Sequence, residues 1–382
     1  MVQFTRTFVA GLIGLAGLGF AHPGHDVKAE AAERAAFLKR TPIESRSLGH
    51  CAENLKARGY EAKNVARRQQ TVEQLRRKRG IQARSSHLNA RDLDALLNTT
   101  HHSTLDVSPV TDPLVLFQSN ASCILGPDVT QGPYYVTGEL IRKNVVEDQA
   151  GVPMFLDIQL IDTNTCEPVP RVYIDLWHCN ATGVYSGVVA NGNGDSNDTT
   201  NINSTFLRGI QQTDPYGVSQ FETIFPGHYT GRTTHIHILS HAANETIRLR
   251  NNTVSGLYTS HASHVGQIFF DQELIHKVEA MPPYSTNTQE LTTNTDDSIL
   301  AQEADTIDPF VQYVFLNEEN VQDGIFAWIS MGIDATEDAA VTPAAYMTGD
   351  GGIENENSGM GGPGGAPPGG AGAPPNGTLP GM

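Results

Sequence analysis

The sequence predicts a mainly β protein whose central part, residues 120–335, folds as an antiparallel sandwich or barrel. Three observations support this fold class. Short runs with alternating apolar and polar residues recur through the central part, and turn-forming residues separate them. The central part is acidic throughout, whereas a basic segment precedes it and a segment rich in Gly and Pro follows it. Hydrophobic residues make up 39% of the 382-residue chain, which is enough for a buried core and excludes wholesale disorder.

The predicted strands are short. Phe155–Ile161 shows the pattern clearly, because apolar side chains occupy every second position and would all point to one face of a sheet. The other predicted strands are Arg171–Trp177, Val218–Phe225, His235–Leu239, Gln267–Phe270, Val311–Leu316 and Ile325–Met331.

A basic arm, residues 22–110, precedes the central domain. Residues 22–100 contain 16 Lys/Arg and 9 Asp/Glu, a net charge of +7, whereas residues 101–382 contain 8 and 33, a net charge of −25. From Ala29 to Arg79 the composition favours helix, and we expect two helices with a break near Gly59. The cluster Arg76-Arg77-Lys78-Arg79 is of a kind that processing proteases cut. The arm is therefore either a propeptide or a helix that docks on the acidic body.

Residues 1–21 have the features of a secretory signal peptide: Arg6 precedes an apolar stretch, and Gly19-Phe20-Ala21 resembles a cleavage site. The mature chain would begin near His22 and be extracellular. Eight Asn-x-Ser/Thr sequons support a secreted glycoprotein: Asn98, Asn120, Asn180, Asn197, Asn203, Asn244, Asn251 and Asn376. We expect Asn180 to be unmodified, because it lies very close to the candidate site described below.

Four cysteines could form two disulfides in a secreted protein: Cys51, Cys123, Cys166 and Cys179. Pairing of Cys166 with Cys179 is not expected, because the strand predicted between them, with an extended length of roughly 20 Å or more, would hold them too far apart to bridge. The two other sets of pairings stay open.

Composition also limits the partners. The net charge of −17 argues against nucleic acid, which binds positively charged surfaces. The mature chain has no apolar run long enough to span a membrane, so no membrane partner is expected. The Gly- and Pro-rich residues 348–382 are predicted to form a disordered tail, because they have little to bury.

The segment that carries chemistry is Pro226-Gly227-His228-Tyr229-Thr230-Gly231-Arg232-Thr233-Thr234-His235-Ile236-His237. His235 and His237 are two residues apart on a predicted strand, so both imidazoles project from one face and can bind one metal ion. A Pro-Gly turn can fold the ring of Tyr229 back toward them, and Tyr185 closes another polar run. Phenolate oxygen is a hard, anionic ligand that favours a trivalent cation.

These motifs resemble those of the intradiol ring-cleavage dioxygenases, specifically the secreted fungal members, over residues 120–335. The stretches that carry the resemblance are Gly132-Pro133-Tyr134-Tyr135, the run from Asp175 to Tyr185, Arg208-Gly209, Thr213-Asp214, Gly217, Phe221-Glu222-Thr223-Ile224 and Pro226–His237. The resemblance implies an antiparallel β-sandwich of the intradiol dioxygenase type.

The resemblance also implies roles for individual residues. Tyr185, Tyr229, His235 and His237 would be the four ligands of one non-haem Fe³⁺, and Arg232 would lie beside the reacting ring. Tyr134 and Tyr135 would line the mouth of the substrate site, and Trp177 and His178 would be structural supports.

The implied reaction is cleavage of a catechol between its two hydroxyl-bearing carbons, with both atoms of O₂ inserted to give a muconate-type diacid. A catechol loses two protons when it chelates the metal. In the family, the tyrosine at the position of Tyr229 then leaves as the neutral phenol, while the tyrosine at the position of Tyr185 stays bound.

Other interpretations remain at this stage. The chain could be a secreted β-sandwich binding or cell-wall module without catalysis, which would bind no iron. A copper site at His22 is a weaker alternative. The run Asn191-Gly192-Asn193-Gly194-Asp195 lacks the spacing of a calcium loop and is expected to be a glycosylated turn. The substrate among catechols, and a possible homodimer, are left open.

Overall fold

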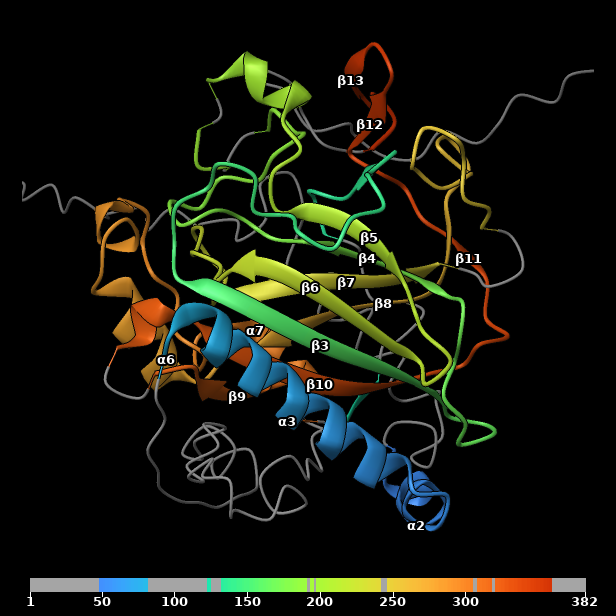
Figure 1. Ribbon diagram of the computed structural model, residues 1–382. Coiled ribbons are helices and arrows are strands. Elements are labelled where there is room, and N and C mark those ends of the chain that lie inside the picture. The colour runs from blue at the N-terminus through green and yellow to red at the C-terminus, as the bar shows by residue number, and fades with distance from the viewer. Residues whose placement is uncertain are drawn as a thin grey trace, which may run out of the picture.

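The computed structural model describes residues 48–81, 122–124, 132–190, 193–195, 197–241, 246–304, 308–317 and 320–358. Figure 1 shows its strands, which are β1 (Ser122–Ile124), β2 (Val136–Thr137), β3 (Pro153–Asp162), β4 (Tyr173–Trp177), β5 (Arg208–Gln212), β6 (Val218–Ile224), β7 (His235–His241), β8 (His261–Phe269), β9 (Gln312–Phe315), β10 (Ile325–Ile333), β11 (Ala339–Ala340), β12 (Ala345–Thr348) and β13 (Gly351–Glu354). The α-helices are α2 (Ala52–Ala57), α3 (Tyr60–Arg79), α6 (Gln272–Glu279) and α7 (Ser298–Glu303). The short 3-10 helices are η2 (Leu48–Cys51), η3 (Thr199–Asn203), η4 (Tyr284–Thr286) and η5 (Val321–Asp323).

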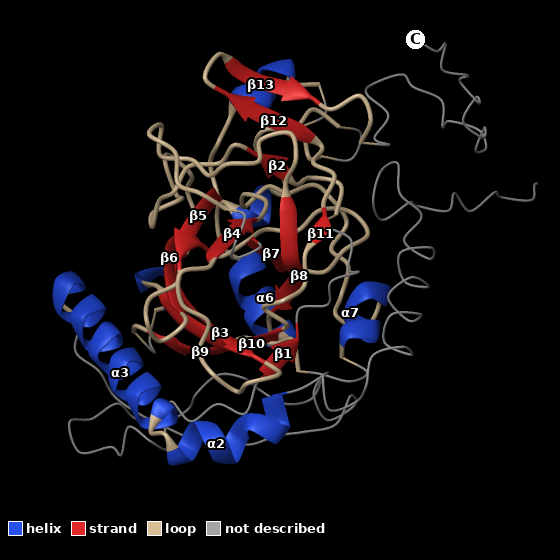
Figure 2. Ribbon diagram, turned by 90° about the vertical axis from the view of Figure 1, so that its right-hand side faces the viewer, coloured by secondary structure: helices blue, strands red, loops and turns tan. Residues whose placement is uncertain are grey.

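Two five-stranded sheets form the body. One has the order β1-β10-β3-β6, with β9 also paired to β10, and the other has the order β11-β8-β7-β4-β5. Figure 2 shows the sheets as two layers. The predicted sandwich is confirmed, and most neighbouring strands are antiparallel. One addition is that β10 pairs in parallel with both β1 and β3; between β3 and β10 the chain forms four strands of the second sheet, which gives the long connection that parallel neighbours need.

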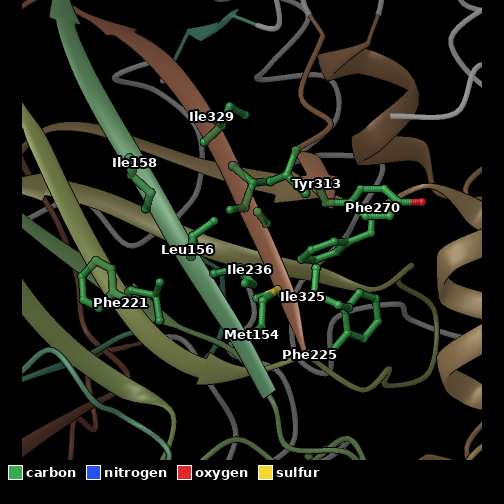
Figure 3. Packing of buried hydrophobic residues seen from close by; sticks show 14 of the residues in the cluster. Met154, Leu156, Ile158, Phe221, Phe225, Ile236, Phe270, Tyr313, Ile325 and Ile329 are labelled. Atoms are coloured by element: carbon green, nitrogen blue, oxygen red, sulfur yellow. The ribbon is translucent and has the colours of Figure 1, made fainter. Parts of the chain in front are cut away.

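The core lies between the two sheets (Figure 3). Leu156 and Ile158 of β3 and Ile329 of β10 point into it from one layer, and Ile236 and Ile238 of β7 belong to the same cluster from the other. Each is at most 1% exposed. Burial of one such side chain stabilises the fold by about 1.5–3 kcal/mol, so this apolar layer fixes which face of each strand is left for chemistry.

The basic arm is helical where the structure describes it. α2 and α3 are separated by Gly59, which has φ of 71°, and the predicted break at this glycine is confirmed. α3 runs along β3 and β10 on the side away from the second sheet (Figure 1). Val65 and Val72 of α3 pack with Phe326 and Trp328 of β10, which makes the outer face of this sheet a second, smaller core.

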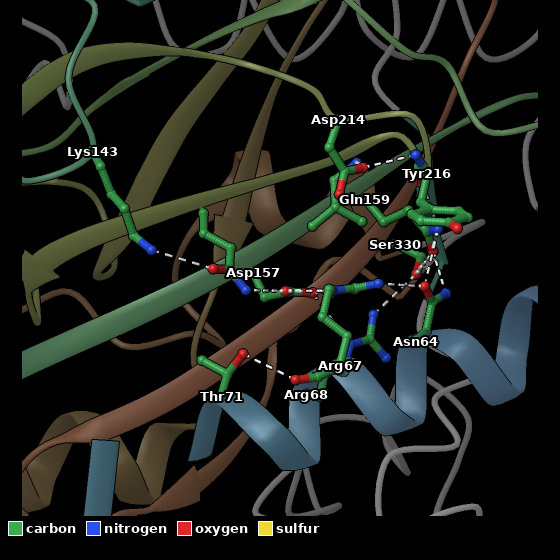
Figure 4. Close-up of polar contacts among 12 residues, drawn as sticks. Asn64, Arg67, Arg68, Thr71, Lys143, Asp157, Gln159, Asp214, Tyr216 and Ser330 are labelled. Carbon is green, nitrogen blue, oxygen red and sulfur yellow. Dashed lines mark hydrogen bonds and ion pairs between the residues drawn. The ribbon is translucent and has the colours of Figure 1, made fainter. Parts of the chain in front are cut away.

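A buried ion-pair cluster holds α3 on the body (Figure 4). The carboxylate of Asp157 on β3 accepts hydrogen bonds from Arg67 Nε at 3.0 Å and Nη2 at 2.7 Å, and Arg68 Nε lies 3.3 Å away. These arginines lower the pKa of Asp157 against the opposing effect of burial. Arg76 donates to the backbone oxygens of Phe315 and Leu316. Docking of the arm on the acidic body, one of the two alternatives, is therefore observed for residues 48–81.

A disulfide joins the arm to the body between Cys51 and Cys166. The expectation of two disulfides is wrong, because Cys179 is a free, buried thiol. Cys179 lies just after the end of β4 in the second sheet, and its Sγ donates to the carbonyl oxygen of Gly227 at 3.3 Å. Cys123 lies on β1 at the edge of the other sheet, so the topology separates the two residues.

The prediction of disorder from residue 348 is wrong for its first part. Residues 345–354 form the hairpin β12–β13, and β12 pairs in parallel with β2. Ala344 N donates to Tyr135 O at 2.7 Å, and Gly352 N donates to Asn203 Oδ1 at 3.0 Å. The glycines thus gain order from partners that are distant in sequence, which composition cannot reveal.

Several sequence predictions fall outside the described residues: the signal peptide at residues 1–21, the site at His22, and the sequons at Asn98, Asn120, Asn244 and Asn376. Of the helices that the structure does describe, none combines the length and the apolar character needed to cross a bilayer.

The Asp157 cluster predicts a large effect of removing one charge. Asp157→Asn leaves two guanidinium groups without their buried counter-ion, and we expect a loss of about 3–5 kcal/mol in the free energy of unfolding. The matched control is Glu167→Gln, which removes an exposed pair with Arg58 and should cost about 0–1 kcal/mol. Urea denaturation measures both. Equal losses in the two variants would contradict the role given to Asp157.

A buried histidine predicts how stability depends on pH. Burial lowers the pKa of His264 on β8 to about 3, and its Nε2 accepts a hydrogen bond from Asp334 N at 2.9 Å. The unfolded chain therefore binds a proton below about pH 6.5 that the folded chain does not, and this residue alone should lower stability by about 1.4 kcal/mol per pH unit as the pH falls from there. Urea denaturation from about pH 7 to pH 5 should show a shallower decline for His264→Gln, and no change of slope for the exposed His276→Gln. Parallel profiles for wild type and His264→Gln would refute this.

Candidate metal centre

The centre of the site is strand β7, every residue of which is buried. Because side chains alternate along a strand, Ile236 and Ile238 enter the core between the sheets, and His235 and His237 project from the other face, as predicted. The Nε2 atoms of the two histidines are 3.1 Å apart. Two imidazole nitrogens thus face one small region that is closed to solvent.

Two tyrosines complete the cluster from loops. Tyr185 lies in the loop that follows β4, and Tyr229 lies in the loop between β6 and β7. Tyr229 Oη lies 3.4 Å from His235 Nε2. The ring centroid of Tyr185 lies 5.4 Å from that of Tyr229 and 6.1 Å from that of His237. The four residues named from the sequence are therefore brought together, and each is at most 2% exposed.

Neighbouring groups fix the orientation of the imidazoles. His235 Nδ1 lies 2.6 Å from the carbonyl oxygen of Thr233, to which it donates, so the lone pair of Nε2 faces the cluster. The indole of Trp177 stacks on His237 with 4.9 Å between centroids and 5° between planes. Gly132 lies close to the same ring, where a Cβ would stand 2.8 Å from His237 Cε1. The glycine of the Gly-Pro-Tyr-Tyr motif is thus required by close approach to this ring, and its φ of 72° also favours glycine.

Two asparagines that sequence reasoning did not identify hold the backbone of Tyr185. Asn193 Oδ1 accepts from Tyr185 N at 2.6 Å, and its Nδ2 donates to Tyr185 O at 2.8 Å. Asn201 Nδ2 donates to the same oxygen at 2.7 Å. Both side chains are buried, so Asn193, in the segment predicted to be a glycosylated turn, also supports the backbone of Tyr185.

A further contact joins the two tyrosine loops. Gln289 Oε1 accepts from Thr230 N at 3.1 Å, beside Tyr229, while its Nε2 donates to Thr182 O at 3.2 Å, near Tyr185. A Cβ on Gly183 would lie 2.2 Å from the carbonyl oxygen of His228, so the loops touch backbone to backbone. The approach of Tyr185 and Tyr229 is therefore set by packing between loops and not by sheet register.

Asn180, the sequon residue near the site, has its amide in use within the first of these loops. Its Nδ2 donates to Gln149 at 3.0 Å, and its Oδ1 accepts from the backbone of Thr182 and Val184. A glycan on this nitrogen would compete with the hydrogen bond to Gln149.

Arg232 is fully buried beside the cluster. Its Nε donates to Asp297 Oδ2 at 2.7 Å, and its Nη2 donates to Gln267 Oε1 at 2.5 Å. This burial shows that the ion pair of Arg232 is not a surface one. Asp297 and Gln267 were not identified from the sequence, although an Asp before the helix-forming Ser298–Glu303 is a recognisable N-cap signal.

The two motif tyrosines occupy different places. The ring of Tyr134 lies 4.6 Å from that of Tyr185 and 5.7 Å from that of Tyr229, so it borders the cluster. Tyr135 packs on Trp177 instead, and its hydroxyl pairs with Ser260. Both are buried, and only Tyr134 touches the predicted ligands.

Arg208 and His178 are supports. Arg208 Nη2 donates to Tyr134 O at 2.6 Å and to Ser186 O at 2.7 Å, which ties the Gly-Pro-Tyr-Tyr segment to the residue after Tyr185. His178 Nε2 pairs with Thr223 Oγ1 at 2.7 Å, and burial lowers the pKa of His178 to about 4, so it is neutral.

The donor set fits a trivalent cation. The Oη atom of Tyr185 is buried and has no hydrogen-bond partner among the described residues. Burial, and then the neighbouring Tyr229, raise the pKa of Tyr185 well above its ordinary value, whereas the positive charge of Arg232 lowers it. A bound cation would reverse the first effect and favour phenolate. Two phenolic oxygens and two imidazole nitrogens together suit a hard metal such as Fe³⁺.

A family model described as Dioxygenase matches residues 124–301, a range that contains all the site residues described above. No curated protein sequence matches the chain.

Similar solved structures include an intradiol ring-cleavage dioxygenase from Tetranychus urticae, 28% identical, with 56% of this chain and 97% of that chain covered and a TM-score of 0.44. The dioxygenase domain of a dioxygenase carbohydrate-binding protein fusion from Streptomyces sp. SirexAA-E is 21% identical, with 53% and 94% covered and a TM-score of 0.33. Hydroxyquinol 1,2-dioxygenase from Pseudomonas putida DLL-E4 is 16% identical, with 56% and 67% covered and a TM-score of 0.35. Residues 124–301 thus match the Dioxygenase family model, and the chain is similar to solved intradiol ring-cleavage dioxygenases.

Proposed function

We propose that the protein is an extracellular Fe³⁺-dependent dioxygenase that opens catecholic rings between their two hydroxyl-bearing carbons and releases muconate-type diacids. The observation that carries this proposal is the convergence of Tyr185, Tyr229, His235 and His237 in one buried cluster. When bound, ferric iron would draw electron density from the catecholate and make a ring carbon reactive toward O₂.

The four residues would hold the iron in two different ways. His235 and His237 come from one strand inside two paired neighbours, β4 and β8, so their positions are rigid. Tyr185 is held through its backbone by two asparagines. Tyr229 lies in the loop of residues 225–231, where the backbone N–H of the next residue, Thr230, donates to Gln289.

Tyr229 is suited to accept a proton from the substrate. A catechol must lose two protons to bind as a dianion. Tyr229 Oη, as a phenolate, can accept one of them and become a neutral phenol, and a hydroxide ion would take the other and leave as water. Its Oη already lies 3.4 Å from His235 Nε2, within the region where the substrate oxygens would enter. Tyr185 would stay bound as the phenolate when the cation is present, because its backbone is held in place and Arg232 opposes the rise in its pKa that burial causes.

Arg232 would stabilise negative charge that develops on the ring during oxidation, because its guanidinium stays cationic and is held in place. Tyr134 borders the two tyrosine ligands and would limit the space open to ring substituents. The identity of the preferred catechol therefore depends on this side of the cluster.

An extracellular location is supported by two features. The disulfide between Cys51 and Cys166 belongs to the type that persists in oxidising compartments. The sequon residues Asn197, Asn203 and Asn251 are exposed. Release into the culture medium and a loss of mass on deglycosylation would test this part of the proposal.

The main test is oxygen uptake by the purified, iron-loaded protein with a panel of catechols, hydroxyquinols and larger diols. We expect uptake together with a ring-opened diacid that contains both oxygen atoms of labelled O₂. A semialdehyde from cleavage outside the diol, or no uptake with any diol, would overturn the proposal. A binding or cell-wall module would give no uptake and no bound iron.

Tyr185→Phe removes a phenolate that should give the ferric protein its colour. We expect a weakened visible charge-transfer band and a kcat lower by about a hundredfold or more, because one anionic ligand is lost. Tyr216→Phe is the control, since Tyr216 is exposed and distant from the cluster. Visible absorption and oxygen uptake measure both variants. An undiminished band in Tyr185→Phe would remove this residue from the ligand set.

Gly132→Ala places a methyl group against the ring of His237. Gly59→Ala is a matched control, because Gly59 has nearly the same φ (71° against 72°) but nothing within 4 Å of the added Cβ. We expect both to lose about 1–2 kcal/mol of stability from backbone strain, and only Gly132→Ala to bind Fe³⁺ more weakly. Competition with a chelator measures the affinity. Equal affinities would contradict the role of His237.

A further inference from the structure

The carboxylate of Asp297 makes an unusual number of contacts for a residue that is not among the predicted ligands. Its Oδ2 accepts from Arg232 Nε at 2.7 Å and from Thr233 N at 2.8 Å. Its Oδ1 accepts from Ile299 N at 2.9 Å and Leu300 N at 3.0 Å, where it caps α7. Both members of its ion pair with Arg232 are completely buried. The two oxygens therefore serve two separate structures.

The Oδ2 contacts reach the candidate metal centre by two routes. The first route leads through Arg232, which is held between Asp297 and Gln267. Gln267 lies directly opposite His237 in the pairing of β8 with β7. The second passes through one peptide: Thr233 gives its N–H to Asp297, and its carbonyl oxygen accepts from His235 Nδ1 at 2.6 Å.

We propose that Asp297 is a positioning residue of this site: one carboxylate oxygen sets both the guanidinium of Arg232 and, through the backbone of Thr233, the imidazole of His235. This inference rests on the proposed function, because it needs Arg232 and His235 to act on iron and substrate.

Charge supports the same assignment. Arg232 has no exposed surface, and a buried guanidinium beside two tyrosines needs a nearby anion to remain in place. Asp297 supplies that anion, because its carboxylate accepts the hydrogen bond from Arg232 Nε. The Nη2 atom of Arg232 donates to Gln267 instead. Asn294 adds a further restraint, because its Oδ1 accepts from Thr233 Oγ1 at 2.6 Å.

Because the two carboxylate oxygens have different partners, a variant can keep the cap of α7 and lose the contacts to Arg232 and Thr233. In Asp297→Asn the amide oxygen can still cap α7, since Asn is as good an N-cap as Asp, but the amide nitrogen then faces two other donors, Arg232 Nε and Thr233 N. Asp297→Ser keeps the cap in the same way and removes the contact to Arg232. Asp296→Asn is the matched control, because Asp296 is the preceding residue, carries the same charge and is exposed.

The experiment compares the three variants and wild type as iron-loaded proteins. We expect Asp297→Asn and Asp297→Ser to lower kcat at least tenfold with a smaller change in KM, and to shift the visible phenolate-to-iron band, because the charge and the imidazole beside the iron have moved. Asp296→Asn should match wild type in all three readouts. A purely structural role in capping α7 would lower the melting temperature and leave the band of the folded protein unchanged.

A double-mutant comparison tests whether Asp297 acts through Arg232. Adding Asp297→Asn to Arg232→Ala should lower kcat by a smaller factor than Asp297→Asn does alone, because the contact to Arg232 is then already absent and only the route through Thr233 remains. Full additivity, or an unshifted band and unchanged kcat in both Asp297 variants, would overturn the inference. If wild type and Asp296→Asn were themselves colourless and inactive with every diol, the proposed function would have failed instead.

Discussion

The alternation of side chains along β7 is the constraint on which the rest of the site depends. This strand is buried on both faces, and its register with β4 and β8 decides which residues enter the core. With Ile236 and Ile238 committed to the apolar layer, His235 and His237 must share the opposite face. A slip of one residue would exchange the two sets and place imidazoles in the core, so the apolar layer enforces the geometry of the metal centre.

The remaining donors are positioned by different physics. Tyr185 and Tyr229 lie on loops, and no sheet register controls how closely they approach each other. Close backbone packing at Gly183, the asparagines that bind the backbone of Tyr185, and Gln289 between the loops supply this control. Each uses a polar side chain to satisfy backbone groups that a loop would otherwise leave unpaired in a buried position. The site therefore combines a rigid strand with loops fixed by hydrogen bonds.

Sequence reasoning identified what is local and missed what is long-range. Alternation predicted the main strands, such as β3 and β7, and short motifs named the residues that converge. The supporting residues Asn193, Asn201 and Gln289 carry no signature, because each binds backbone atoms of a segment that only the fold brings near. The hairpin β12–β13 was missed for the same reason: its glycine-rich sequence gains order by pairing with β2. The second predicted disulfide is wrong because an even number of cysteines cannot show that Cys179, just after β4, is a buried free thiol.

The link between Cys51 and Cys166 has a consequence for how the molecule would respond to a protease. Hydrolysis of the chain just after the basic run that ends α3 would break the peptide connection between the arm and the body. The disulfide between Cys51 and Cys166 would still join them. The helix would stay seated, with Arg67 and Arg68 still on Asp157 and the valines still covering β10. The product would be a nicked, two-chain protein whose parts separate only after reduction, so trimming at that point would not act as release of an inhibitor.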